Sequence, residues 1–318
     1  MPLDDAAVWL CRSLAGESGT VVAGPAGEQA TLALDKWRQI EIAREARFAV
    51  PTSRLIVGRS NLFHEPITYP VVLKPVRAVA ARQGRLTRSR AWFCSTEADL
   101  RAAALDWDGV EPMLLQAYVS GVGEGIFGLA GRRGVLAWSA HRRIRMMNPQ
   151  GSGSSACQSR QIEEPLMDIG NRFVARAGWQ GLFMIELLRD QFGTPWFMEM
   201  NGRTWGSMAL ARRLGFEYPA WAIRLALDPD AEIRSPGDRP SITCRHLGRE
   251  LVHLAFAFRG PKSKVAEGWP SRWHAFKQIA RLRRHDRWYN WRRDDCAVFF
   301  KDTIWTIGAQ LAKLGRGR

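Results

Sequence analysis

The segment "GLFMIELLRDQFGTPWFMEMNGR" at 181–203 constrains the fold more than any other part of the sequence. Two apolar and aromatic runs flank a turn-forming stretch at 191–194, a pattern typical of a β-hairpin. With that loop, Glu186 is expected directly opposite Glu199. Asn201 shares the face of Glu199, because side chains alternate along a strand. Two carboxylates and an amide are therefore expected to converge on one surface.

This convergence leaves two interpretations open. Facing like charges destabilise a strand pair by roughly 0.2–1 kcal/mol, a repulsion that a hard cation removes. One or two carboxylates, completed by phosphate oxygens, usually bind Mg²⁺, so Glu186, Glu199 and Asn201 are candidate magnesium ligands. Alternatively, the carboxylates face solvent or pair with arginine, since a register shift of one residue would separate the two glutamates.

Lysine is scarce in this chain: only seven of its 46 basic residues are lysine, and only Lys36 and Lys74 precede residue 262. Lys74 lies near the end of "YPVVLKPV", a short run that is typical of a buried strand. A buried ammonium needs a partner, and phosphate is one that lysine binds as a point charge. The alternative is a lysine whose apolar stem is buried while its ammonium reaches solvent.

The hydrophobic pattern indicates an α+β fold rather than a doubly wound sheet. Helices are predicted over 35–48, 96–106, 165–177 and 206–214, with Asp35 and Thr96 as N-caps of the first two. Strands and hairpins lie between them. The stretch "NPQGSGSSA" at 148–156 has no large apolar side chain and is predicted to be a mobile loop.

Several common signatures are absent from the sequence. There is no GK dipeptide, no GxSxG and no HExxH. One GxGxxG match, Gly123, Gly125 and Gly128, follows a predicted strand, but no helix opens after it, which argues against a dinucleotide site. The surrounding "LLQAYVSGVGEG" could present backbone N–H and C=O groups to a planar heterocycle, and is equally compatible with an ordinary strand and turn.

The spacing of the cysteines and the length of the apolar runs indicate a cytoplasmic protein. Five cysteines are scattered without a CxxC spacing, as expected for reduced thiols in a cytoplasmic protein. The longest apolar runs are shorter than the roughly 18 residues of a membrane span. Acidic residues occupy the N-terminus, where a signal peptide would be basic.

The positive charge is concentrated at the C-terminus. The formal net charge is +15, and the residues from Arg245 onward contain 17 Lys and Arg against 6 Asp and Glu, together with five of the 14 tryptophans. We place a boundary within 235–243. Three interpretations remain open for this region: a helical cap with core tryptophans and solvated arginines, contact with an anionic membrane surface or acidic protein, and, least favoured, single-stranded nucleic acid.

Taken together, "YPVVLKP", then "LLQAYVSGVGEG", then "MIELLRD" and "FMEMNGRTWGS" resemble the ATP-grasp superfamily in order, spacing and content. The resemblance extends over 35–227 and is greatest to the carbamoyl-phosphate-synthase-like carboxylate–amine ligases. It implies an ATP-grasp fold, with two α+β lobes that clasp ATP. It also implies a Mg²⁺- and ATP-dependent ligase that activates a carboxylate as an acyl-phosphate for attack by an amine or similar nucleophile.

The resemblance also implies residue roles. The ATP contacts would be Lys36, Val72, Lys74, Gln116, Ala117, Tyr118, Val119, Glu124 and Met198. Among these, 116–119 would be the hinge that reads adenine, and Glu124 would hold the ribose. The metal ligands would be Glu186, Glu199 and Asn201. Substrate binding would involve Arg143, Arg145 and Arg203, near the 148–156 loop, while Lys74 and Arg203 would be catalytic.

The domain organisation expected from this resemblance has four parts. Residues 1–34 would be a remnant of the pre-ATP-grasp domain, 35–115 and 116–235 the two lobes, and 236–318 a basic helical extension. A separate partner could supply the rest of the N-terminal domain. The sequence departs from the family in "NGR", which replaces the commoner Asn-Pro-Arg. It departs again after Lys74, where a single glycine stands in place of a Gly-rich loop. The competing class is a basic binding module whose nucleotide-binding core is not catalytic.

Overall fold

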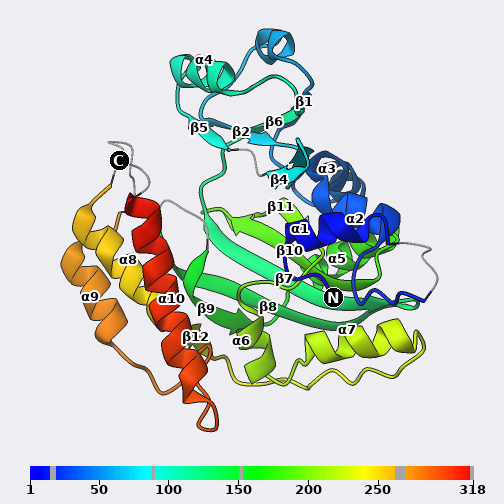
Figure 1. The fold of residues 1–318 in the computed structure, drawn as a ribbon, viewed down its shortest axis with the longest axis vertical. Coiled ribbons are helices and arrows are strands. Elements are labelled where there is room, and N and C mark those ends of the chain that lie inside the picture. Colours follow the sequence, from blue (N-terminus) through cyan, green and yellow to red (C-terminus); the bar gives the residue numbers. More distant parts are fainter. Residues whose placement is uncertain (15–18, 88–89, 150–152, 262–268, 316–318) are drawn as a thin grey trace. The chain divides into compact units, whose positions relative to one another are not determined.

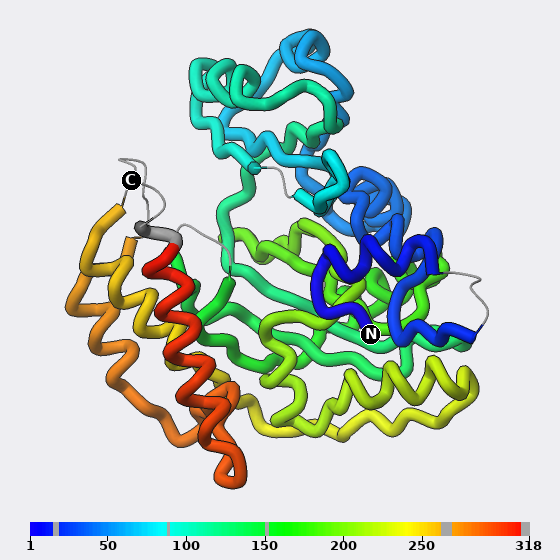
Figure 2. The backbone as a smooth tube through the Cα atoms, in the orientation of Figure 1, coloured from blue at the N-terminus to red at the C-terminus, as the bar shows by residue number. Residues whose placement is uncertain are grey.

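The computed structural model describes residues 1–14, 19–87, 90–149, 153–261 and 269–315. The chain folds into two compact units, and Figure 2 follows the backbone as it passes repeatedly between them. The first unit comprises Met1–Trp138, Ile162–Trp205 and Tyr218–Ser235. The second comprises Ser139–Gln161, Gly206–Glu217 and Pro236–Arg318. The division into four functional segments stays a prediction.

A four-stranded antiparallel sheet lies within the first unit (Figure 1). Its strands, in spatial order, are β1 (Ser53–Ile56), β6 (Met113–Ala117), β2 (Val71–Pro75) and β5 (Trp92–Cys94). Helix α4 (Glu97–Asp106) packs against β5 and begins with a capping box between Thr96 and Asp99. Leu73, Leu100 and Trp107 belong to the core between them. The short elements η1 (Arg59–Phe63), β3 (Ala80–Arg82) and β4 (Arg85–Thr87) complete this part.

A second set of strands in the first unit carries the hairpin. Strands β11 (Pro195–Asn201), β10 (Gly181–Arg189) and β7 (Val122–Gly131) pair in that order. Helix α3 (Lys36–Glu45) packs on β11 and α7 (Tyr218–Leu227) on β7 and β10. The other helices of this unit are α1 (Asp5–Cys11), α2 (Gly27–Leu34) and α5 (Glu164–Arg176).

Strand β8 (Gly134–Met146) begins in the first unit and belongs to the second from Ser139 onward. The second unit also contains β9 (Ser154–Arg160), β12 (Thr243–Arg245) and β13 (Asp286–Trp288), where β9 pairs with β8 and β12. Its helices are α6 (Met208–Arg213), α8 (Leu247–Arg259), α9 (Arg272–Ala280) and α10 (Cys296–Gly315). Helix α8 packs against both α9 and α10.

The predicted elements are largely confirmed. The helices expected at 35–48, 96–106 and 165–177 are α3, α4 and α5, with Asp35 and Thr96 as N-caps. The helix expected at 206–214 is the shorter α6. The loop predicted over 148–156 extends too far toward the C-terminus, because β9 begins at Ser154 and Ser155 is fully buried. Residues 150–152 of that loop lie outside the described residues.

The buried serines explain this error. Ser155 Oγ lies 3.4 Å from the carbonyl oxygen of Arg145 and 3.5 Å from Oε1 of Glu250, so its hydroxyl has partners inside the second unit. Small polar residues look like a loop in the sequence, but a strand can bury them where neighbouring elements provide hydrogen-bonding groups.

All five cysteines are free thiols, and only Cys296 is exposed. Across the described ranges, no helix has both the length and the apolar character that a membrane crossing requires.

Candidate functional site

The two hairpin acids face each other as predicted: Glu186 on β10 is the direct partner of Glu199 on β11. The pairing contains a β-bulge, because Leu187 pairs with Phe197 while Glu186 pairs with Glu199. Met198 is therefore the extra residue. A bulge sets two residues of one strand against one of the other and shifts the alternation beyond it. Without this bulge, the register nearer the turn would place Met198 opposite Glu186.

Two lysines from other elements approach these acids. Lys36 is the first residue of α3, whose N-cap Asp35 accepts hydrogen bonds of 3.0 Å from the N–H groups of Trp37 and Arg38. The Lys36 Nζ lies 3.4 Å from Oε2 of Glu199. Lys74 is on β2, where it pairs with Leu114 of β6. The helix start and the strand thus bring both early lysines to the hairpin.

Burial, and to a lesser extent the neighbouring charge of Lys36, lower the pKa of Lys74, which comes to about 8. The carboxylates of Glu199 and Glu186 act in the opposite direction and favour the charged ammonium. Lys74 therefore interacts electrostatically with both hairpin acids and with the second lysine. An ammonium with a pKa this low exchanges its proton close to physiological pH, and a bound anion would hold it charged.

Burial raises the pKa of Glu199, but the charges of Lys36 and Lys74 outweigh burial, so the pKa falls to about 2. A hydrogen bond from Asn201 acts in the same direction, with Nδ2 of Asn201 3.3 Å from Oε1 of Glu199. The Glu199 carboxylate is consequently ionised throughout the physiological range and keeps its oxygens available as ligands.

These residues fit a magnesium ion in their chemistry. Two half-buried carboxylates, those of Glu186 and Glu199, face each other across the pair of strands β10 and β11. Asn201 lies two residues after Glu199 on β11 and brings an amide oxygen to the same group. Hard oxygen ligands of this kind suit Mg²⁺, which usually keeps waters and substrate phosphates in its shell. No group of three or more His, Cys, Asp or Glu side chains gathers within the described ranges. The amide and nonprotein oxygens would therefore have to complete the shell.

The hinge residues 116–119 leave β6 and enter a short connection to β7. Gln116 is buried, and its Nε2 donates to Oγ of Ser53 at 2.9 Å. The N–H of Ala117 donates to the carbonyl of Thr52 at 2.8 Å, and the N–H of Tyr118 to that of Pro70 at 3.0 Å. These two N–H groups are thus bound within the sheet. Within the hinge, Val119 would have to supply the donor for a heterocycle.

The proposed packing surfaces for that heterocycle are both half-buried: Val72 lies on β2 and Met198 at the bulge. Tyr118 is 46% exposed as a residue, and its ring makes an edge contact with that of Phe93, with centroids 4.9 Å apart. Val72 pairs with Phe93 in the sheet. The structure therefore leaves apolar surface beside the hinge.

Two predicted ligand contacts already have protein partners. Glu124 on β7 is 3% exposed, and Nε of Arg189 donates to its Oε2 at 2.9 Å. Arg189 also pairs with Glu163 at 3.2 Å. The Nε of Arg203 lies 2.5 Å from Oδ1 of Asp5 on α1. A ribose at Glu124 or an acyl-phosphate at Arg203 would have to compete with these ion pairs.

Arg143 and Arg145 belong to the second unit, whereas the residues of this group belong to the first. Arg143 is half-buried opposite Cys157, whereas Arg145 is buried and forms an ion pair with Glu250. Their roles in substrate binding stay predictions.

The sequence analysis missed Arg189, Asp5 and Glu250. Strand alternation could have found Arg189, because it lies two residues beyond Leu187, the direct partner of Glu124. Such diagonal cross-strand neighbours are within reach of a long side chain. Asp5 and Glu250 are distant in sequence from their arginines, so no local pattern indicates them.

No protein-family model matches this chain, and no curated protein matches it by sequence. Solved structures do match. The L-amino acid ligase from Bacillus licheniformis is 18% identical at a TM-score of 0.56, with 72% of this chain and 56% of that chain covered. The ADP complex of purK, N5-carboxyaminoimidazole ribonucleotide synthetase, is 12% identical at a TM-score of 0.58, with 81% and 67% covered.

Biotin carboxylase from Campylobacter jejuni is 18% identical at a TM-score of 0.55, with 73% of this chain and 53% of that chain covered. The chain thus spans a little over half the length of the ligase and the carboxylase. At these identities the likeness establishes the fold. It confirms the α+β ATP-grasp fold that the motifs predicted.

Proposed function

We propose that this chain is a Mg²⁺- and ATP-dependent ligase that joins a carboxylate to an amine or a similar nucleophile. The observation that supports this most directly is the group formed by Lys36, Lys74, Glu186, Glu199 and Asn201. Two cations suited to phosphate and three oxygen-bearing side chains suited to a hard cation meet on an ATP-grasp fold. Folds host several chemistries, so the proposal rests on the group rather than on the fold alone.

The proposed reaction needs no nucleophile from the protein. An oxygen of the substrate carboxylate attacks the γ-phosphorus of ATP, the bond to the bridging oxygen breaks, and ADP leaves. The amine then attacks the acyl carbon, phosphate leaves, and the amine loses a proton. Positioning and charge stabilisation dominate the catalysis of such phosphoryl transfers.

Each residue of the group has a role in this proposal. Lys36 and Lys74 would hold the ATP phosphates as point charges. Glu186, Glu199 and Asn201 would hold Mg²⁺, which when bound neutralises phosphate charge. The Val119 N–H would orient the adenine between Val72 and Met198. Arg203 would bind the transferred phosphoryl group after exchanging its Asp5 partner, and Glu124 the ribose after exchanging Arg189.

The proposal is tested by phosphate release with amino acids, dipeptides and sugar acids as carboxylates, with the mass of each product recorded. Amino acids come first, because one similar structure is named an L-amino acid ligase. We expect release that depends on one carboxylate and one amine together, and a product whose mass equals their condensation. ATP binding without turnover on any pair would favour the noncatalytic binding module. We place this activity in the cytoplasm.

We propose further that the C-terminal region contacts an anionic membrane surface. On α10, Val298, Ile304, Trp305 and Leu311 are all exposed, with Trp305 73% exposed, and their spacing puts them along one side of the helix. Exposed Lys301 lies among them. An apolar stripe with nearby cations is typical of helices that lie in a membrane interface.

Sedimentation with lipid vesicles tests this second proposal. We expect the chain to pellet with phosphatidylserine-containing vesicles and not with neutral ones, and Trp305→Ser with Ile304→Ser to abolish pelleting. Binding to an acidic protein or to single-stranded DNA in place of the vesicles would contradict it.

A further inference from the structure

The second unit contains a cavity of about 360 Å³ whose charged lining residues are mostly cations. Five basic side chains line it: Arg145, Arg245, Lys277, Arg281 and Arg283. The acid in its lining is Asp286. Strands β8 and β12, helix α9, the segment that leads into β13 and the first residue of β13 contribute these side chains, all within the second unit.

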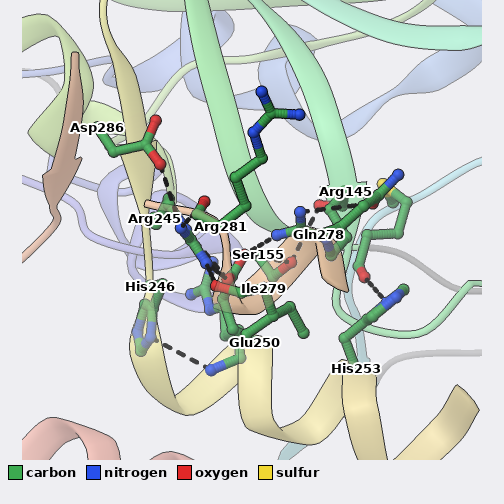
Figure 3. A network of polar contacts seen from close by, with 12 residues as sticks. Arg145, Ser155, Arg245, His246, Glu250, His253, Gln278, Ile279, Arg281 and Asp286 are labelled. Carbon is green, nitrogen blue, oxygen red and sulfur yellow. Dashed lines mark hydrogen bonds and ion pairs between the residues drawn. The ribbon is translucent and has the colours of Figure 1, made fainter. Parts of the chain in front are cut away.

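Two buried arginines, Arg145 and Arg245, line the cavity, and we call them and their acidic partners its floor; Figure 3 shows their polar contacts. Arg145 and Arg245 both pair with Glu250, whose side chain is fully buried beneath them. Arg245 also donates to Oδ2 of Asp286 and to the carbonyl of Arg281, each at 3.1 Å. Two guanidinium groups thus meet two carboxylates, and the floor is close to neutral. Hydrogen bonds in several directions fix the orientation of Arg245.

One polar group of the floor lacks a partner. The Nε of Arg145 is buried and makes no hydrogen bond with any described residue. Its Nη2 lies 3.5 Å from Oε1 of Gln278, at the limit for a hydrogen bond. Buried donors in native proteins nearly always have an acceptor. Arg145 also lines the cavity, so a ligand with acceptor oxygens would accept from the part of its guanidinium group that borders the cavity.

Three cations at the rim give the cavity its excess charge. Lys277, Arg281 and Arg283 are exposed, and none of them has an ion pair with another described residue. Lys277 Nζ lies 5.1 Å from the centroid of the Trp273 ring, a contact that holds the ammonium near the rim. With a balanced floor, these three charges remain to be neutralised.

We propose that this cavity binds a small ligand with a multiply charged oxyanion group, a phosphate ester or a polycarboxylate. Guanidinium groups bind both kinds of oxyanion through paired hydrogen bonds. The volume falls within the range of small-molecule sites. The rim cations would neutralise the ligand, and Arg145 would donate to it. This site lies beyond the proposed ligase function, and it requires neither ATP nor any residue of the first unit.

Calorimetric titration of the full chain, in metal-free buffer and without nucleotide, tests this proposal. Sodium pyrophosphate is the phosphate probe and sodium citrate the carboxylate probe, and the tighter one identifies the class. We expect saturable binding at one site. Lys277→Gln with Arg281→Gln should weaken it at least about tenfold, since two charge-assisted contacts are lost. Both residues are exposed, so the melting temperature should not change.

Two controls keep this test separate from the nucleotide site. Arg272→Gln with Arg284→Gln removes the same charge from exposed residues outside the cavity lining, and should leave the affinity unchanged. Lys74→Ala impairs the proposed ATP site and should also leave pyrophosphate binding intact. Equal weakening in both double variants, loss of binding in Lys74→Ala, or no binding of either probe would each overturn the proposal.

Discussion

The ammonium of Lys36 lies 3.4 Å from the carboxylate of Glu199, and this pair changes what the hairpin acids do. Considered alone, Glu186 and Glu199 repel each other, and neutralising one would relieve strain. Lys36 and Lys74 convert that repulsion into a mixed cluster in which Glu199 is stabilised as an anion. Neutralising Glu199 should therefore lower the stability of the protein, whereas the hairpin alone predicts that it would raise it.

Glu199→Gln should destabilise the protein without ligand by about 1–3 kcal/mol, because the charged partner of Lys36 is lost. It should also abolish the thermal shift caused by Mg·ATP and lower phosphate release about 10²-fold, the scale of one lost transition-state stabiliser. Thermal melts and a phosphate assay check this. Glu41→Gln, exposed on the same helix as Lys36, is the matched control. A Glu199→Gln chain with unchanged turnover would remove the metal assignment.

Stability should depend on pH through Lys74. Its pKa is about 8 in the folded chain against an ordinary value of 10.5. Between these values the unfolded chain binds the proton that the folded chain has lost, so the Lys74 contribution to stability rises with pH from about 8 to 10.5. Denaturation series across this range should show the rise, and Lys74→Met should remove it. A rise of equal size in the variant would assign it to another group.

ATP binding should be coupled to proton uptake at Lys74. Near pH 8.5 its ammonium is partly deprotonated, and bound phosphate charge would restore the proton. Calorimetry in two buffers with different ionisation enthalpies should then give different binding heats. The difference should correspond to an uptake of about half a proton or more per ATP bound. Lys74→Met should give equal heats in both buffers.

Arg189→Met should destabilise the protein by about 3–5 kcal/mol, because it removes the arginine that pairs with the buried Glu124 carboxylate. Adding Glu124→Gln should restore most of this stability. Urea denaturation of both variants measures the effect. Arg176→Met breaks an exposed pair with Glu45 and should change stability by less than about 1 kcal/mol. No rescue by the second substitution would argue against the pair as the cause.

Gly128 of the GxGxxG match has a packing role. A Cβ atom there would lie 2.4 Å from the Phe183 ring and 2.9 Å from the carbonyl oxygen of Ala137. Gly128→Ala should therefore destabilise the fold by about 1–3 kcal/mol. Gly58→Ala, where the nearest atom is 3.9 Å away, should have little effect in the same melts. Equal stability of the two variants would mean that β10 adapts to the added methyl group.

The sequence by itself determined the elements whose signals are local. Asp35 and Thr96 mark helix starts because their side chains accept hydrogen bonds from N–H groups two or three residues on. The hairpin follows from strand alternation around a short turn, whereas the predicted pairing of Glu186 with Glu199 also requires the bulge at Met198. The family motifs then indicated the ATP-grasp fold, since their order and spacing survive at low identity.

Only the tertiary structure decided which charges meet. Near the turn, the strands pair in a register that would set Met198 opposite Glu186. The bulge at Met198 changes this register by one residue, so that Glu186 pairs with Glu199. The partners of Glu124, Arg203 and Arg145 are set by packing between segments up to 198 residues apart. The same packing buries Lys74 and lowers its pKa. Burial and charge act through space, so a residue's place in the sequence indicates its chemistry only once the fold has brought its neighbours together.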